Sequence, residues 1–120
     1  MSDEDAARLH EQPVKDVRHE GDAVVVELQG ELDLYNAQLV RDALGSAAGN
    51  GALRVVVDLG EVTFVDSTAM GLLIEARSRM TDRSAFVLAS PRLETRRALQ
   101  VSGLDRHFTI RDTVADALSV

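Results

Sequence analysis

The feature that most constrains the fold is Leu53–Leu59, a near-continuous apolar run that only Arg54 and Asp58 interrupt. Strands that are covered on both faces read as runs of this kind, because neither face needs polar side chains. The run therefore predicts a strand in the middle of a sheet. Neighbouring strands and covering helices are then expected from the rest of the chain.

Strand patterns precede and follow this run. Val24–Leu28 alternates apolar positions, and Val14–Arg18 is expected to pair with it as a hairpin through a turn at Glu20–Asp22. Gly30 is expected to stop the second strand. Further short strands are predicted at Ala85–Ala89 and around Phe108 and Ile110.

Helical patterns alternate with these strands. Asn36 suits the N-cap of a first helix, which Gly49–Gly51 ends. A second helix begins after Asp66-Ser67-Thr68, and its residues at offsets 0, 3, 4, 7 and 11 form one apolar stripe: Ala69, Leu72, Leu73, Ala76 and Met80. This stripe and the central strand should cover each other, which predicts a buried set of Val57, Leu59, Leu72, Leu73 and Ala76.

The last third of the chain continues the alternation. Ser90-Pro91 is expected to open a third helix and Gly103 to close it. Thr113 and Asp116 form an acidic variant of the capping box before a final apolar segment. The chain is thus predicted to have an α/β fold, with a sheet covered by helices.

Composition narrows the possible functions. A chain of 120 residues fits one domain, and we expect an acidic, flexible tail at residues 1–12 and a folded domain at residues 13–120. A net charge of −7 without a basic cluster argues against binding to nucleic acid or to an anionic membrane surface. The absence of cysteine excludes thiolate nucleophiles and Cys-based zinc sites. No apolar stretch resembles a signal peptide or a membrane span, so a cytoplasmic protein is expected.

Asp66-Ser67-Thr68 is the first candidate site, at the point where a buried strand is followed by a helix. Unpaired backbone N–H groups at a helix N-terminus attract negative charge. Asp66 or Ser67 could serve simply as an N-cap. Alternatively, the hydroxyl groups could form a phosphorylation or partner site, since functional residues gather on loops at strand ends. The local pattern is compatible with both interpretations.

Two other places in the chain carry charged residues that could form a site. The Gly30–Asn36 turn carries two carboxylates, but His10, His19 and His107 are scattered, which favours a solvated turn over acid-base or metal chemistry. Arg96-Arg97 is typical of a solvated helix face. A phosphoacceptor receiver domain is rejected because the only lysine, Lys15, is near the N-terminus.

Three segments together resemble the STAS domain of bacterial anti-sigma factor antagonists. Gly30–Asp33 with Asn36-Ala37 is similar to the strand-to-helix turn of the family, and Val55–Leu59 with Phe64–Gly71 to its central strand and phosphorylation loop. Arg96–Leu99 with Ser102–Asp105 and Phe108 is similar to its third helix and the turn beyond. The resemblance spans roughly residues 14–120.

The resemblance implies a single STAS domain with a four- to five-stranded, mostly parallel or mixed sheet flanked by helices. It also implies a function in transcription regulation, for stress response or sporulation. The unphosphorylated protein would bind an anti-sigma factor that is a serine kinase and thereby release a sigma factor. The kinase would phosphorylate the protein, and a serine phosphatase would reverse the modification. The chain would be a ligand and substrate, not an enzyme, without metal or cofactor.

The resemblance assigns the phosphoacceptor to Ser67, although Thr68 retains a second hydroxyl and Ala69 replaces the usual glycine. The expected partner-binding residues surround it: Asp33, Asn36, Asp66, Thr68 and Met70. A monomer or weak dimer is expected. The alternative is a STAS scaffold subunit of a stress-signalling or lipid-transport assembly, without a phosphorylation switch.

Overall fold

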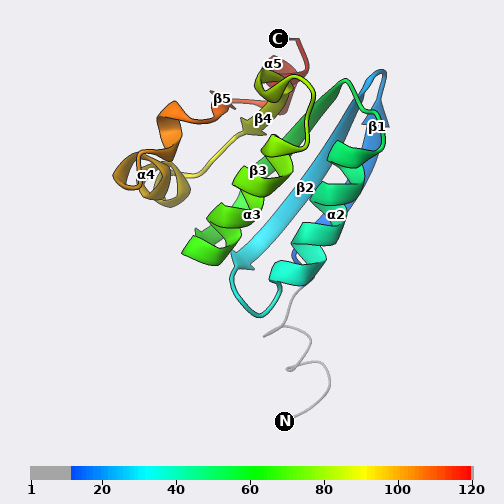
Figure 1. The fold of residues 1–120 in the computed structure, drawn as a ribbon. Coiled ribbons are helices and arrows are strands. Elements are labelled where there is room, and N and C mark those ends of the chain that lie inside the picture. The colour runs from blue at the N-terminus through cyan, green and yellow to red at the C-terminus, as the bar shows by residue number, and fades with distance from the viewer. Residues whose placement is uncertain (1–11, 120) are drawn as a thin grey trace.

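A five-stranded sheet forms the centre of the protein in the computed structural model, which describes residues 12–119 (Figure 1). The tail predicted for residues 1–12 lies almost wholly outside the described residues. The strands lie side by side in chain order: β1 (Val14–Glu20), β2 (Ala23–Leu32), β3 (Arg54–Val65), β4 (Phe86–Ala89) and β5 (Thr109–Arg111).

The sheet is mixed, as the resemblance implied. β1 pairs antiparallel with β2, and each later pair is parallel. The predicted hairpin is therefore present, and Gly21 adopts φ of 61° in its turn, where glycine has no steric penalty. Each parallel pair needs a crossover connection, which the helices provide.

Helices cover the two faces of the sheet unequally. One face packs against three of them: α2 (Ala37–Gly49), α3 (Ser67–Ser78) and α4 (Leu93–Val101). The other face is covered at one end by α5 (Val114–Ser119), whose Ala117 packs against Val25 and Val56. Short 3-10 turns occur at Arg83–Ala85 and Leu104–Arg106. No helix in the described part of the chain has the length and apolar character needed to cross a membrane.

The core is formed mainly by β3 and α3, as the sequence predicts. β3 is the middle strand, and its side chains point alternately into the two apolar clusters, Val57 into the larger one and Val56 into the smaller one. All five residues predicted to be buried are buried: Val57, Leu59, Leu72, Leu73 and Ala76. The remaining stripe residues, Ala69 and Met80, are buried as well.

Two predicted boundaries were wrong. β2 does not stop at Gly30; it continues to Leu32 because the sheet accommodates the positive φ of this glycine, 72°, next to a shift in register. Ser90 does not open the third helix. It adopts φ of 57° after β4, and α4 begins at Leu93 with Arg92 in the N-cap position. Local preferences predicted a cap at Ser90, but the backbone N–H of Ser90 donates to the carbonyl of Arg111 in β5 at 2.9 Å, so this residue still belongs to the edge of the sheet.

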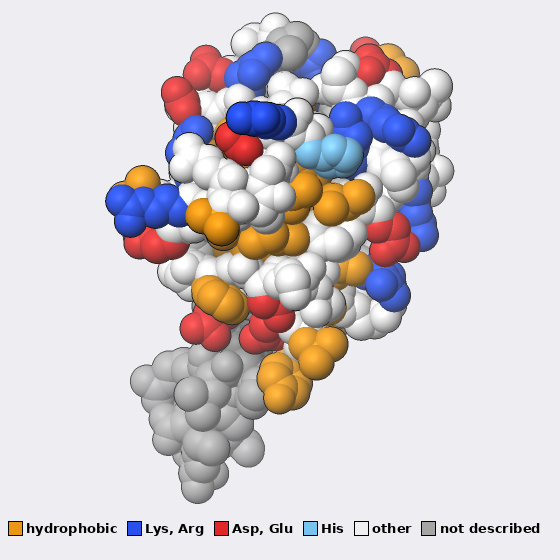
Figure 2. All heavy atoms as spheres, turned by 60° about the vertical axis from the view of Figure 1, so that its left-hand side comes forward, with side chains coloured by type: hydrophobic (Ala, Val, Ile, Leu, Met, Phe, Trp, Pro, Cys, Tyr) orange, Lys and Arg blue, Asp and Glu red, His pale blue; other side chains and the backbone are white. Residues whose placement is uncertain are grey.

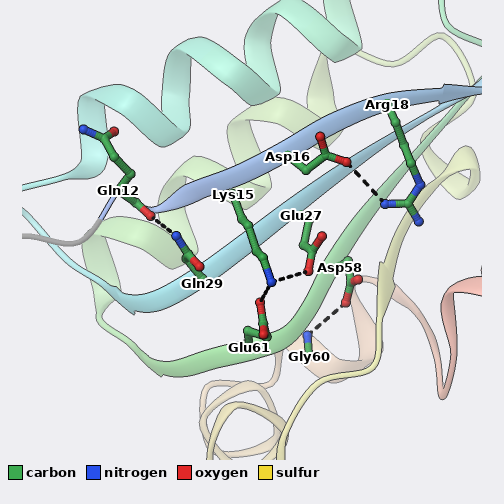
Figure 3. A network of polar contacts seen from close by, with 9 residues as sticks. All are labelled: Gln12, Lys15, Asp16, Arg18, Glu27, Gln29, Asp58, Gly60 and Glu61. Atoms are coloured by element: carbon green, nitrogen blue, oxygen red, sulfur yellow. Dashed lines mark hydrogen bonds and ion pairs between the residues drawn. The ribbon is translucent and has the colours of Figure 1, made fainter. Parts of the chain in front are cut away.

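The face opposite α2 and α3 carries a polar network over β1, β2 and β3 (Figure 3). The Lys15 ammonium lies 2.7 Å from a carboxylate oxygen of Glu61 and 3.7 Å from one of Glu27. The hydrogen bond to Glu61 raises the pKa of Lys15, and the same bond lowers the pKa of Glu61. This part of the sheet is therefore solvated, in contrast to the end that α5 covers.

Replacement of a core leucine on α3 tests the assignment of its buried face. Leu73→Ala should lower the free energy of unfolding by about 2–5 kcal/mol, because Leu73 is 1% exposed and its side chain would leave a cavity. Leu93→Ala is the matched control, since Leu93 is 60% exposed and should change stability by less than about 1 kcal/mol. Urea unfolding of both variants provides the measurement. Equal losses for the two would contradict the assignment.

Candidate functional site

Ser67 is the first residue of α3, directly after the end of β3. The N-cap is Asp66, whose Oδ1 accepts a hydrogen bond from the backbone N–H of Ala69 at 2.9 Å. Asp66 therefore provides the capping that either residue could have supplied, and the Ser67 side chain is exposed. The Ser67 hydroxyl is thus accessible at the end of α3 where the helix dipole favours negative charge.

The turn between β2 and α2 lies beside this helix end and is held by its own side chains. Asp33 Oδ1 accepts from the N–H groups of Tyr35 at 3.0 Å and Asn36 at 3.3 Å. Asn36 accepts from the N–H of Asp33 at 3.0 Å and donates to the carbonyl of Glu31 at 2.7 Å. Asn36 therefore occupies the predicted N-cap position, but its side chain makes no cap hydrogen bond and instead bonds to the backbone of Glu31 and Asp33.

Asp66 joins this turn to α3. While Oδ1 caps the helix, Oδ2 accepts from the N–H of Leu34 at 3.1 Å, and the Asp66 N–H donates to the carbonyl of Leu32 at 3.0 Å. One carboxylate thus fixes the position of the 33–36 turn relative to Ser67. Sequence reasoning missed this role, because the bond to Leu34 joins residues 32 apart in the chain and no local pattern indicates it.

The remaining predicted site residues lie on the first turn of α3. Thr68 and Met70 are half-buried, in contrast to the exposed Ser67. The Met70 sulfur lies 3.8 Å from the hydroxyl of Ser102, at the end of α4, so Met70 sits between the two helices. The side chain of Ser67 is consequently more accessible than that of Thr68.

Large apolar side chains are exposed near the same end of the sheet, which sequence reasoning did not predict. Tyr35 is 90% exposed, Leu34 67% and Phe64 52%. Leu34 and Tyr35 belong to the turn that Asp66 holds, and Phe64 lies two residues before Asp66. Figure 2 brings the α4 side of the molecule forward and shows hydrophobic side chains gathered between charged ones. Large apolar side chains that remain exposed are a common feature of protein interaction sites.

The other places considered in the sequence do not join this site. Arg96 forms an ion pair with Asp112 at 3.0 Å, and Arg97 is exposed. No group of three or more His, Asp or Glu side chains among residues 12–119 is arranged to hold a metal ion. A cavity of about 400 Å³ lies between the β1–β2 hairpin and the end of α2, lined in part by Val17, His19 and Asn50. It opens at the far end of the sheet from Ser67, so it is not part of the same site.

The chain is similar to several bacterial regulators. Its residues 14–117 match the STAS domain family. An anti-sigma-F factor antagonist, RsfB, of Mycobacterium tuberculosis is 30% identical over 101 residues, which cover 84% of this chain and 82% of that protein. An anti-sigma-B factor antagonist of Listeria monocytogenes is 28% identical over 92 residues, 76% of this chain and 81% of that one.

Comparison with solved structures gives the same kind of relative as comparison of sequences. The crystal structure of an anti-sigma factor antagonist from Mycobacterium paratuberculosis superposes with a TM-score of 0.81 at 27% identity, covering 87% of this chain and 89% of that one. The matched residues 14–117 include all five strands and every helix of the described fold up to the first turn of α5. The fold, the relatives and the match over most of the chain lead to one conclusion: this protein belongs to the STAS domain family.

Proposed function

We propose that this protein is an anti-sigma factor antagonist that binds an anti-sigma factor with serine kinase activity and is released when Ser67 is phosphorylated. Relatives of nearly the same length bear the name anti-sigma factor antagonist. The observation that carries the proposal is the position of Ser67: exposed, first in α3, and beside a turn whose apolar side chains are exposed. The protein would act by binding rather than by catalysis.

Binding would use the surface around Ser67. Asp33 and Asn36 hold the turn, Asp66 holds the turn to the helix, and Thr68 and Met70 extend the surface along α3. Exposed Tyr35 and Leu34 would supply the apolar contact area that buried interface centres need. Displacement of the sigma factor would follow because both proteins compete for the same anti-sigma factor.

Phosphorylation would switch binding without unfolding the domain. The kinase would transfer the γ-phosphoryl group of ATP to Ser67 Oγ, forming an O–P bond, breaking the bond to ADP and releasing the hydroxyl proton. A phosphoryl group adds a charge of about −1.5 to −2, which a helix N-terminus favours by about 0.3–1 kcal/mol. At a protein interface the same charge costs several kcal/mol unless it is paired. A serine phosphatase would restore the binding form, and a cytoplasmic location would be needed for access to the sigma factor.

Ser67 variants test the switch. Ser67→Ala should fold with a stability within about 0.5 kcal/mol of the wild type, because Asp66 and not Ser67 is the N-cap. It should bind the kinase and stay bound when ATP is added. Ser67→Asp should fold as well but bind more weakly, because its charge must be desolvated at the contact. Calorimetric titration against candidate serine-kinase anti-sigma factors from the same genome provides the measurement.

Thr68→Ala is the matched control for the neighbouring hydroxyl. It should remain a substrate, and mass spectrometry after incubation with kinase and ATP should place one phosphoryl group on Ser67. A phosphoryl group on Thr68 would move the site by one residue. The switch would be contradicted if the wild type stays unmodified after incubation with kinase and ATP and binds the kinase only as tightly as Ser67→Asp does. That result would favour a scaffold function.

Asp66 variants separate a positioning role from a contact role. Asp66→Ala removes the cap and the acceptor for Leu34, and should lower the free energy of unfolding by about 1–3 kcal/mol. Asp66→Asn retains one side-chain oxygen for the cap, but its amide NH2 group cannot accept from the N–H of Leu34, so it should lose only part of that free energy. Thermal unfolding measures both. If Asp66→Asn keeps stability but loses kinase binding, the carboxylate charge contacts the partner directly; retained binding would assign it to positioning alone.

A further inference from the structure

β1 forms an open outer edge of the sheet. The strand pairs with β2 on one side, and no other strand among residues 12–119 pairs with its outer side. A bulge interrupts the register between Val14 and Asp16, but the residues from Asp16 to Glu20 pair regularly with β2. An exposed edge strand offers a row of backbone N–H and C=O groups that can pair with another strand. Val17 adds an apolar side chain at this edge that is 47% exposed.

The charges on β1 alternate in sign on one face of the sheet. Asp16, Arg18 and Glu20 occupy alternate positions, so their side chains share the open face shown in Figure 3. Arg18 lies 3.7 Å from Asp16 and 3.2 Å from Glu20. With Lys15, the strand carries two basic and two acidic side chains and has no net charge, although the whole chain has a charge of −7. A second copy that approaches along this strand therefore meets no net charge on it.

Strand geometry limits how two copies of β1 can pair. In an antiparallel pair, two residues that lie directly opposite each other have their side chains on the same face of the sheet. A two-fold axis between two copies of β1 must therefore lie between the two copies of one and the same residue. An axis at Asp16 would place the two Asp16 carboxylates opposite each other. An axis at Arg18 would place the two Arg18 guanidinium groups opposite each other. An axis at His19 would run the pairing into the hairpin turn. An axis at Val17 places each Asp16 opposite Arg18 of the other copy.

We propose that a second copy of this chain docks antiparallel along β1, with the two-fold axis at Val17, and extends the sheet across both copies. The two Val17 side chains would meet on the helix-covered face, and two Asp16–Arg18 pairs would form on the open face. Within one copy Asp16 lies opposite Glu27 of β2, an unfavourable like-charge pair that Arg18 of the second copy would offset. This self-association goes beyond the proposed switch, because β2 separates β1 from the β3–α3 junction that carries Ser67.

The association should be weak. A pairing of one short strand buries less than the area of a standard stable interface, which corresponds to a dissociation constant of about 10 µM to 1 mM. Analytical ultracentrifugation of the wild type from about 10 µM to 1 mM should therefore show the average mass rising from that of one chain toward that of two. Amide hydrogen exchange within β1 should slow over the same concentration range. A single-chain mass throughout the range would overturn the proposal.

Charge exchange tests the register. Asp16→Arg alone would place cations opposite each other, and Arg18→Asp alone would place carboxylates opposite each other. Each variant should raise the dissociation constant at least tenfold. An equimolar mixture of the two should associate again, because every cross-strand pair is then of opposite sign, and the double variant Asp16→Arg/Arg18→Asp should associate with itself.

Two variants on exposed positions of α4, Glu94→Arg and Arg97→Asp, make the same changes in net charge away from β1. They should self-associate like the wild type, and circular dichroism should confirm that all variants are folded. A wild type that dimerises while the mixture stays monomeric, or α4 variants that lose association to the same extent, would assign the dimer to another surface and overturn the proposal.

Discussion

The parallel pairing of β2 and β3 is the interaction on which the rest of the structure depends. It aligns Leu32 with Val65, so the two strands end side by side and the connections that follow them meet. The first connection is the 33–36 turn and the second is Asp66, whose carboxylate accepts one hydrogen bond from Leu34 in that turn and one from Ala69 in the first turn of α3. The strands are long and their inward side chains are buried, which fixes the register of the pair. The pairing of these two strands in the middle of the sheet therefore determines the positions of the groups around Ser67.

Because helices cover the two faces of the sheet unequally, the molecule has a closely packed core on one side and an exposed polar surface on the other. Three helices bury one face, and the core there consists mainly of aliphatic side chains, with Phe86 and Phe108, that pack closely. The polar network of Lys15, Glu27 and Glu61 lies on the other face, and no strand among residues 12–119 pairs with the outer edge of β1. In the proposed switch and self-association, a change of charge at Ser67 or along β1 would act on association, whereas a change of volume at Leu73 would act on folding.

The proposed switch and the proposed self-association use the same physical principle at two separate places. In both, backbone groups that the fold leaves unpaired are exposed: N–H groups at the start of α3, and the outer edge of β1. A charge added at Ser67 is tolerated by the isolated domain and is costly only when a partner removes water from it. The charges on β1 are tolerated in one copy and gain pairing when a second copy aligns with them.

Sequence alone determined the class of the fold, the hairpin, the central strand and the buried stripe on α3, because these depend on side-chain periodicity within short segments. It also located Ser67 at a strand-to-helix junction. Only the tertiary structure decided that β2 continues past Gly30 to Leu32 and that α4 starts after Ser90 and Pro91, since pairing and connection geometry overrode local preferences there. The bond from Leu34 to Asp66 likewise required the sheet, because it joins groups that are distant in the chain and become neighbours only when two strands end together.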